Sequence, residues 1–271
     1  MAMLTSNLTI ETLRKMFAEG KRFDGRGLLD HRNLEVSFDV SNKAEGSARV
    51  KLGKTEVIAG VKLALGTPYP DSPDKGNLVV SSDFLPLASP RFELGPPKFD
   101  AIELPRLVDR AIRESHMIEL DKLVVTPKEK VWTVYIDLYP INDDGCLVDA
   151  ATIAAIAALK TAKVPGIDKE GLVDYENHKI ALPISKETAP ISFTFYKLGN
   201  SIIMDPTREE EEACEAKVTW GISKWNKQYM INSCQKGKMA VFTKDEIEKM
   251  MDILPDKFDE INEKLKKFLP K

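Results

Sequence analysis

Hydrophobic and polar positions alternate along the chain with two different periods, which predicts a mixed α/β protein. Near the N-terminus, four apolar residues fall on one stripe of a short helix, namely Ile10, Leu13, Met16 and Phe17. Thr9 is the expected N-cap of this helix, and Gly20 is its expected stop. From Leu34 the period shortens to two in LEVSFDV and SARVKLGKTEVIAGVKLAL, which residues 53–55 interrupt as a hairpin turn does. We expect antiparallel strands in this region.

Two central segments have the pattern of helices. The first runs from about Asp100 to Glu119 with apolar residues at i, i+3, i+4 and i+7, and Pro105 fits it only if it lies in the first turn. The second begins within DDGCLVDAATIAAIAALKTAK and is small and apolar nearly all round from Ala150 to Leu159. A helix without a polar face is buried on most sides.

The pattern becomes loop-like after Val164, in VPGIDKEGLVDYENHK, and we place a boundary between two halves there. Strands resume in APISFTFYKLGNSIIMDP, where Gly199 and Asn200 can turn a hairpin. KLGNSIIM resembles the earlier KLGKTEVI in pattern, which hints at an internal duplication. KVTWGISKW and QYMINSCQ predict another strand pair.

The last segment begins with the capping box TKDE, Thr243 to Glu246, which predicts a C-terminal helix. Pro255 should kink or interrupt that helix, because proline removes a hydrogen bond and clashes with the preceding turn.

Composition narrows the class of protein. The 271 residues suffice for one large or two packed modules, and 43% hydrophobic with 30% charged residues is ordinary for a globular chain. A formal net charge of −3 provides no bulk basic field for nucleic acid, so any such contact must be a local patch. Cys146, Cys214 and Cys234 form no CxxC pair, which favours a reducing, cytoplasmic location. No apolar run approaches a membrane span, so we expect no membrane contact.

The sequence lacks the common motifs of metal, nucleotide and hydrolase chemistry. His31, His116 and His178 are isolated, and the sequence contains no HExxH, Walker A, GxGxxG or GxSxG motif. We therefore expect no metal and no cofactor.

Two charged features have competing interpretations. Arg106, Arg110 and Arg113 form a helical stripe that is either a solvated face, with Glu103, Asp109 and Glu114 as partners, or a ridge that contacts phosphates. The acidic run in MDPTREEEEACEAK either holds a metal or a catalytic proton, or is a solvated helix start. Periodicity alone does not decide either case.

Six segments occur in an order that is informative as a set: RFDGR, GSARVKLGKTEVIAG, PDKGNLVVSSDFLPLA, AIELPRLVDRAIRES, VWTVYIDLYPINDDG before a small-residue helix, and IIMDPTREEEEACEAK. Together they closely resemble the RNase PH family, and within it the non-catalytic ring subunits of the archaeal exosome. The resemblance extends from about Lys21 to the C-terminal helix.

The resemblance implies an α/β (α+β) fold of two RNase PH-like modules related to the ribosomal protein S5 domain 2 fold. We expect an N-terminal helix and basic segment at 1–30, a first module at 31–165 and a second at 166–271. It also implies a ring of six such subunits that degrades RNA from the 3′ end by phosphorolysis. For the KRFDGR segment, whose role could be in fold, interface or RNA binding, we favour a structural role of Asp24 and Arg26.

The resemblance also permits a residue-by-residue comparison with active relatives. Their loop Asp-Gly-Gly-Ser/Thr-Arg holds inorganic phosphate, but here its last three positions are Cys146, Leu147 and Val148, which supply neither a hydroxyl donor nor a counter-charge. Their two catalytic aspartates match Glu211 and Lys217, and a lysine cannot act as a carboxylate. We therefore interpret the acidic run as a solvated helix start that lies favourably near the helix dipole.

The arginine stripe has a counterpart in the resembled ring subunits, where positions matching Arg106 and Arg110 contact single-stranded RNA at the pore, and Arg113 shares that face by geometry. We predict a catalytically silent ring subunit that pairs with a catalytic RNase PH-like subunit as a trimer of heterodimers. A trimeric RNA-binding cap is the further implied partner. Two alternatives are a phosphate-dependent 3′ exoribonuclease active by itself, with Glu211 replacing an aspartate, and a homomeric RNA-binding protein.

Overall fold

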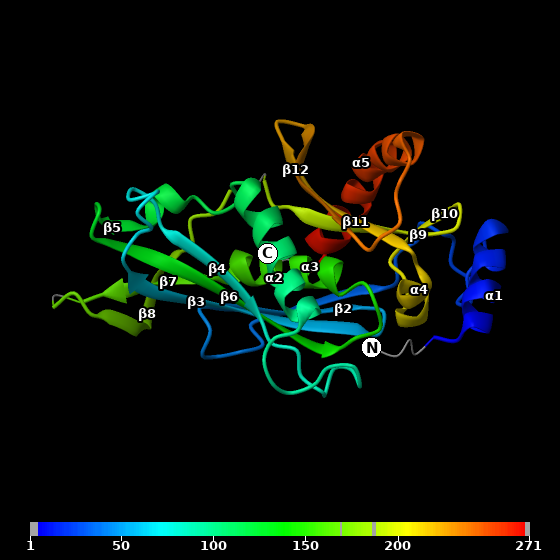
Figure 1. Cartoon of the computed structure of the whole chain (residues 1–271). Helices are drawn as coiled ribbons and strands as arrows, with labels where there is room; N and C mark the ends of the chain where they lie inside the picture. Colours follow the sequence, from blue (N-terminus) through cyan, green and yellow to red (C-terminus); the bar gives the residue numbers. More distant parts are fainter. Residues whose placement is uncertain (1–4, 169, 186–187, 269–271) are drawn as a thin grey trace.

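The computed structural model describes residues 5–168, 170–185 and 188–268, and each half of the chain builds its own sheet (Figure 1). The first sheet has the order β1-β2-β3-β6-β4, with β5 also paired to β6. Only β4 runs parallel to its neighbour β6. Its strands are β1 Leu34–Phe38, β2 Gly46–Leu52, β3 Thr55–Gly66, β4 Asn77–Ser82, β5 Val124–Thr126 and β6 Lys130–Asn142.

The second sheet is antiparallel and has the order β10-β9-β11-β12. Its strands are β9 Ile191–Leu198, β10 Ser201–Met204, β11 Ala216–Trp225 and β12 Gln228–Gly237. The predicted turns in the two similar motifs are confirmed, because Gly53 joins β2 to β3 and Gly199 joins β9 to β10, each with a φ of 60°. That left-handed conformation favours glycine.

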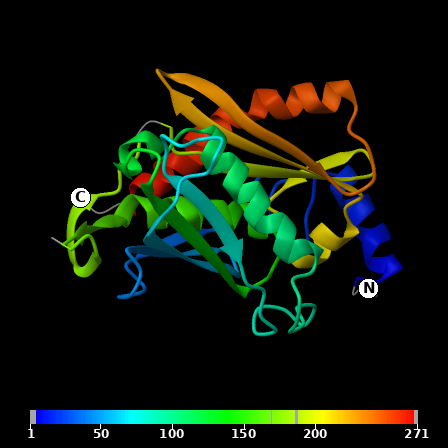
Figure 2. The same ribbon diagram turned by 60° about the vertical axis from the view of Figure 1, so that its left-hand side comes forward.

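Helix α3, Leu147–Thr161, contacts strands of both sheets and is buried from Val148 to Leu159, as its apolar pattern predicted. Its small side chains permit close approach, since a Cβ on Gly46 of β2 would lie 2.3 Å from the carbonyl oxygen of Ala158. Helix α2, Phe99–Glu114, packs on α3 and runs between β4 and β12 (Figure 2). The remaining helices are α1 Asn7–Ala18, the 3₁₀ turn η1 Leu120–Leu123, α4 Arg208–Ala213 and α5 Lys244–Lys266.

Helix α2 differs from its predicted form in two ways. It ends at Glu114, five residues early, because His116 has a left-handed φ of 52° and the Ser115 hydroxyl donates to the carbonyl of Ile112. Pro105 lies well inside the helix and not in its first turn. The carbonyl of Ala101, four residues earlier, loses its helical donor and accepts a hydrogen bond from the Ser82 hydroxyl of β4 at 3.0 Å.

Three other expectations are corrected. The N-cap of α1 is Ser6 and not Thr9, although Gly20 follows the helix with the expected positive φ of 73°. The segment after Val164 is not a loop but a hairpin of β7 Lys163–Ile167 and β8 Val173–Ala181, whose irregular register hides its period. Helix α5 has the predicted capping box and is not interrupted at Pro255, because buried side chains anchor it on both sides of the proline. The alternative, a kink at Pro255, stays a prediction. No helix in the described ranges is long and apolar enough to cross a membrane.

Candidate functional site

The loop that precedes α3 packs directly against the start of α4, so the two segments singled out from the sequence lie together. Gly145 has a φ of 85°, and a Cβ there would lie 2.5 Å from the carbonyl oxygen of Pro206. Cys146 also has a left-handed φ, 58°, and its side chain is fully buried. We call residues 144–149 and 205–212 together the α3–α4 junction.

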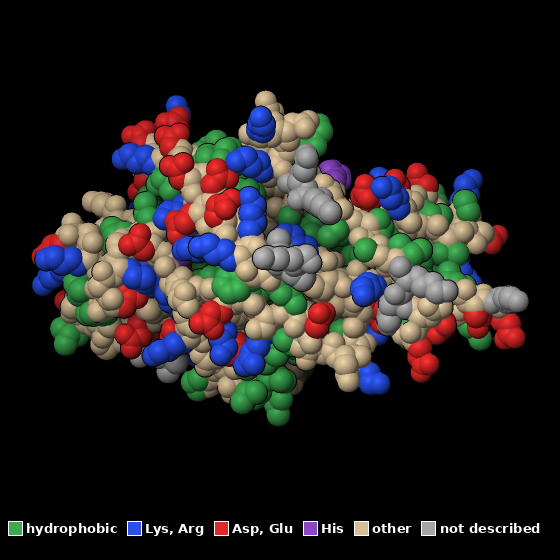
Figure 3. All heavy atoms as spheres, turned by 180° about the vertical axis from the view of Figure 1, so that it is seen from behind, with side chains coloured by type: hydrophobic (Ala, Val, Ile, Leu, Met, Phe, Trp, Pro, Cys, Tyr) green, Lys and Arg blue, Asp and Glu red, His purple; other side chains and the backbone are tan. Residues whose placement is uncertain are grey.

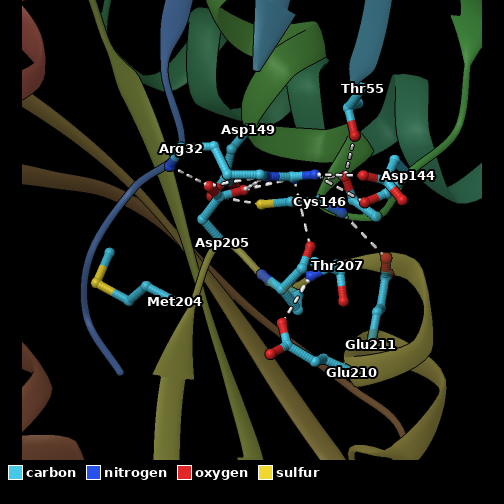
Figure 4. A network of polar contacts seen from close by, with 12 residues as sticks. Arg32, Thr55, Asp144, Cys146, Asp149, Met204, Asp205, Thr207, Glu210 and Glu211 are labelled. Carbon is cyan, nitrogen blue, oxygen red and sulfur yellow. Dashed lines mark hydrogen bonds and ion pairs between the residues drawn. The ribbon is translucent and has the colours of Figure 1, made fainter. Parts of the chain in front are cut away.

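The N-terminus of α3 holds an anion that the chain itself supplies. The Cys146 amide donates to Glu211 Oε2 at 3.0 Å (Figure 4). Glu211 Oε1 accepts from the Tyr196 hydroxyl at 3.2 Å. Arg208 Nη1 lies 3.4 Å from the same carboxylate. A helix N-terminus stabilises negative charge through its free amides and its dipole. Here the Glu211 carboxylate occupies that place.

The adjacent side chains of the loop offer a second anion no polar group. Val148 is buried and Leu147 is half-buried against the core. Both line one wall of a cleft of about 620 Å³ between α2 and the start of α4, where Arg91, Arg208, Glu211 and Glu212 also lie. Arg91 pairs with the buried carboxylate of Asp143, and Arg208 pairs with Glu212. The basic side chains at this end of the cleft are therefore already partnered by acidic ones.

A buried ion pair joins the two halves of the chain behind the loop. Arg32 donates to both oxygens of the fully buried Asp205 carboxylate, and its backbone amide donates to Asp205 Oδ2 at 2.6 Å. The same guanidinium bonds the carbonyls of Asp144 and Gly145 (Figure 4). Arg26 completes the cluster with a 3.2 Å contact to Asp205 and a 2.7 Å contact to Asp24. These contacts support a structural role for the KRFDGR segment.

The acidic run is not the solvated helix start that its sequence suggests. Thr207 and Glu210 do form a capping box for α4, but the Glu210 carboxylate is buried and pairs with buried Arg22. Glu211 binds the α3 N-terminus, and Glu212 accepts from the Thr5 hydroxyl and from Arg208. Three of the four glutamates therefore have structural partners, and only Glu209 is exposed.

A second buried carboxylate lies one turn into α3. Asp149 accepts hydrogen bonds from the backbone amide and hydroxyl of Thr194 at 3.0 and 2.7 Å and from the Cys146 thiol at 3.2 Å. Burial raises the pKa of Asp149 to about 7 despite these donors. A protonated Oδ1 can donate to Thr194, whose hydroxyl can in turn donate to Thr219 at 2.9 Å. The site accommodates the neutral acid.

Lys217, the second position at which we predicted a lost carboxylate, takes part in an ion pair between the two halves. Lys217 of β11 donates to Glu103 of α2 at 2.6 Å, and both side chains are largely buried. A cation therefore stands at the position where the resemblance predicts a carboxylate in active relatives. Its partner Glu103 is one of the three acidic residues that the sequence offered to the arginine stripe.

The three arginines of α2 do not form one uniform stripe. Arg113 pairs with Asp109 at 2.6 Å and donates to the carbonyl of Leu78, so the interpretation as a helix-face ion pair holds for it. Arg106 and Arg110 are exposed, and they make no hydrogen bond or ion pair with any residue that the structure describes. They line a shallow cavity of about 200 Å³ between α2 and the β11–β12 pair.

Other charged surface is mixed. On the face seen from behind in Figure 3, blue and red side chains alternate without a large area of one sign. The Glu19–Lys21 and Lys266–Glu263 contacts are examples of exposed, self-paired charge. Unlike these two pairs, Arg106 and Arg110 have no partner among the described residues, as is also true of exposed lysines such as Lys54 and Lys227.

No metal site emerges among the described residues, where no group of three or more His, Cys, Asp or Glu side chains has suitable geometry. Burial lowers the pKa of His31 to about 4, so this imidazole is neutral, and its ring packs edge-on against Phe193 at 6.0 Å. His116 is an exposed residue at the end of α2. The side chain of His178 lies outside the described part of the chain.

Comparison with known proteins assigns both halves to one family. Residues 30–165 match domain 1 of the 3′ exoribonuclease family, and residues 188–253 match domain 2 of that family. The Thermococcus kodakarensis protein named exosome complex component Rrp42 is 41% identical over 98% of this chain and 96% of its own length.

Two solved structures resemble the fold closely. A chain of the Archaeoglobus fulgidus exosome with RNA bound to the active site has a TM-score of 0.85 and 38% identity, over 96% of this chain and all of that chain. A chain of an archaeal exosome core has a TM-score of 0.79 and 36% identity, over 91% of this chain and 92% of that chain.

Proposed function

Because the chain belongs to the 3′ exoribonuclease (RNase PH) family and contains both of its domains in order, we propose that it is a non-catalytic ring subunit of an archaeal exosome. Its relatives named exosome component Rrp42 and its likeness to chains of archaeal exosome cores support this role. The subunit binds single-stranded RNA and helps to shape a partner's active site without donating catalytic residues.

The observation that carries the catalytic silence is the contact between Glu211 and the α3 N-terminus. Phosphorolysis needs a bound phosphate, and the amide that would receive an anion there already binds the Glu211 carboxylate at 3.0 Å. A second anion beside it would be repelled by that carboxylate. The Glu211 carboxylate is also fully engaged by its own chain, because the Cys146 amide, the Tyr196 hydroxyl and Arg208 all contact it.

The RNA-binding role depends on Arg106 and Arg110. They are one helical turn apart on α2, and their guanidinium groups are exposed and unpartnered within the described chain. Arginine's planar fork suits phosphate oxygens, and contacts of this kind read the backbone and not the bases. Arg113 contributes less, because Asp109 already neutralises it.

The proposed assembly follows from the missing chemistry. A catalytic RNase PH-like subunit supplies the phosphate loop and the carboxylates, and three such heterodimers close a six-membered ring. A trimeric cap with RNA-binding domains is the further proposed partner, and the cytoplasm is the proposed location. We also propose that the domain boundary falls near residue 165, where the matched first domain ends.

The test is release of nucleoside diphosphate from a 3′ single-stranded RNA in the presence of phosphate. Three samples are compared: this chain alone, the catalytic subunit of the same organism alone, and the two reconstituted and sized by light scattering. We expect no release by this chain alone, a mixed hexamer, and higher activity in the mixture. A homohexamer that ignores the added subunit would contradict the assembly, and diphosphate release by this chain alone would contradict its silence.

A further inference from the structure

One face of α2 continues beyond the two free arginines toward the start of the helix. Phe99, Ile102, Arg106 and Arg110 are spaced by three, four and four residues, so they lie along a single stripe. The first two are large hydrophobic side chains that are 74% and 56% exposed. Exposed apolar side chains that border free cations on one helix face indicate a binding surface for a ligand with both characters.

Phe99 stands at the rim of a second cavity, of about 310 Å³, formed by the loop that leads into α2. Phe84 and Phe92 line this cavity and pack on each other with ring centroids 4.5 Å apart. Phe99 also borders the larger cleft at the α3–α4 junction. The exposed ring therefore borders a hollow whose wall combines two aromatic rings with charged residues such as Asp83 and Arg91.

The charges along the stripe change from one end of α2 to the other. Near Phe99 lie Asp100 and Glu103, whereas Lys98 is already paired with Glu93. Glu103 is already paired with Lys217, but the Asp100 carboxylate can accept hydrogen bonds from the exocyclic amines of bases. The other end presents Arg106 and Arg110, which attract phosphate. One helical turn between them, ~6 Å of rise, is of the order of the spacing between phosphates in an unstacked strand.

Together these features match single-stranded RNA in one orientation. We propose that Phe99 is a stacking platform for an unpaired base of the RNA whose neighbouring phosphates lie along Arg106 and Arg110. A protein partner would satisfy the apolar end but would need acidic groups opposite both arginines, whereas one nucleic-acid strand supplies a flat apolar face and regularly spaced charge. The inference rests on the proposed RNA-binding function and adds a base-contacting residue to it.

The experiment measures the affinity of a short 3′ single-stranded RNA for the reconstituted ring that carries variants of this chain. Phe99→Ala should weaken binding about tenfold, because base stacking on an aromatic ring contributes ~1–3 kcal/mol. Phe99→Tyr should bind like the unchanged chain. Leu94→Ala, which shortens an equally exposed apolar side chain of the adjacent loop, is the matched control and should have no effect.

RNAs with a single abasic site, moved stepwise along the strand, identify the mechanism. At one position the abasic RNA should bind the unchanged ring as weakly as intact RNA binds the Phe99→Ala ring, and the two changes together should add no further loss. The salt dependence of Phe99→Ala should match that of the unchanged ring, since no phosphate contact is removed. Thermal melting and light scattering check that the variant folds and assembles.

Each contrary result has a separate meaning. If Phe99→Ala binds RNA normally, or loses the same affinity for every abasic RNA, the stacking platform is wrong while the arginine contacts stand. If Phe99→Ala instead prevents ring assembly, the surface is a protein interface and the inference is overturned. If Arg106→Ala/Arg110→Ala also leaves affinity unchanged, the proposed RNA path itself fails.

Discussion

The α3–α4 junction and the exposed face of α2 are both rich in charge, but they use it in opposite ways. At the junction each of the main charged groups has a close partner, as in Arg22 with Glu210 and Arg32 with Asp205. On α2, Arg106 and Arg110 have none among the described residues. Charge that is buried and paired specifies how the two halves dock, whereas charge that is exposed and unpaired is available to a ligand.

This difference between the two regions fits the proposed role, in which the fold binds RNA without catalysing its cleavage. The N-terminus of α3 still binds an anion, but the anion is Glu211 of the same chain. The two arginines that we propose to contact RNA lie on another element, α2, and do not depend on that contact. Predictions on the two regions can therefore be separated, since changes at the junction should affect stability and changes on α2 should affect RNA binding.

The largest expected effect is at the buried pair of the junction. Glu210→Gln leaves the Arg22 guanidinium buried without a counter-charge, which should lower the free energy of unfolding by about 3–5 kcal/mol. Urea unfolding measures the change. Glu209→Gln, at the exposed neighbour, is the matched control and should change little. Equal effects of the two variants would show that the acidic run is solvated after all.

The next effect concerns Asp149 and depends on pH. Its pKa is raised from 3.8 to about 7 on folding, so the folded state favours the neutral acid. The associated stability is fully present below pH 4 and is lost as the pH rises through about 7, by about 2–4 kcal/mol. Asp149→Asn should remove this loss. We expect the difference in thermal stability between variant and unchanged chain to grow from pH 4 to pH 8.

The control for that prediction is Asp252→Asn, at an exposed position of α5, which should show no comparable trend. A stability difference for Asp149→Asn that stays constant with pH would mean that this carboxyl is ionised throughout and that burial does not govern it.

The next prediction concerns RNA binding by α2. The expected change in binding free energy is smaller than the changes in unfolding free energy at the junction, but its effect on function should be larger. Arg106→Ala and Arg110→Ala should each weaken RNA binding about tenfold, ~1.4 kcal/mol, by removing a charge-assisted contact to phosphate. Each should also reduce the slope of log affinity against log salt by ~0.7. Arg113→Ala, whose guanidinium already pairs with Asp109, is the control. Equal losses in all three would favour a diffuse electrostatic effect over a defined path.

The smallest effect is expected where the regions meet. Lys217→Gln breaks the partly buried pair with Glu103 and should cost about 1 kcal/mol of stability. RNA affinity should change less than with Arg106→Ala, because Lys217 is neutralised in place. A greater loss of RNA affinity than of stability would assign this lysine to the RNA path.

Elements with a strong local period could be predicted from the sequence. The buried helix α3, the glycine turns at 53 and 199 and the capping box of α5 all depend on neighbours within a few residues. The β7–β8 hairpin was missed because its bulges break the alternation. The position of Pro105 inside α2 could not be predicted, because the compensating group lies in a distant strand. That group is the Ser82 hydroxyl, which binds the carbonyl that Pro105 leaves without a helical donor.

The candidate site was predictable only in part. The loss of the phosphate loop and of the second carboxylate stays a prediction, which rests on residue types that cannot do the chemistry. The partners of the acidic run did not follow, because Arg22 and Glu210 are 188 residues apart and only the tertiary fold brings them together. The sequence did single out both residues, Arg22 as part of the KRFDGR motif and Glu210 as part of the acidic run. Neither motif indicated that the two side chains form a pair.

The most direct test of this division compares nucleoside diphosphate release by three reconstituted rings, with this chain unchanged, as Arg106→Glu/Arg110→Glu, or as Glu211→Gln. The account predicts a strong loss of activity with the arginine variant at limiting RNA, and near-normal activity with Glu211→Gln once assembly is matched by light scattering. If instead Glu211→Gln abolishes release and the arginine variant does not affect it, the junction performs chemistry and the account is wrong.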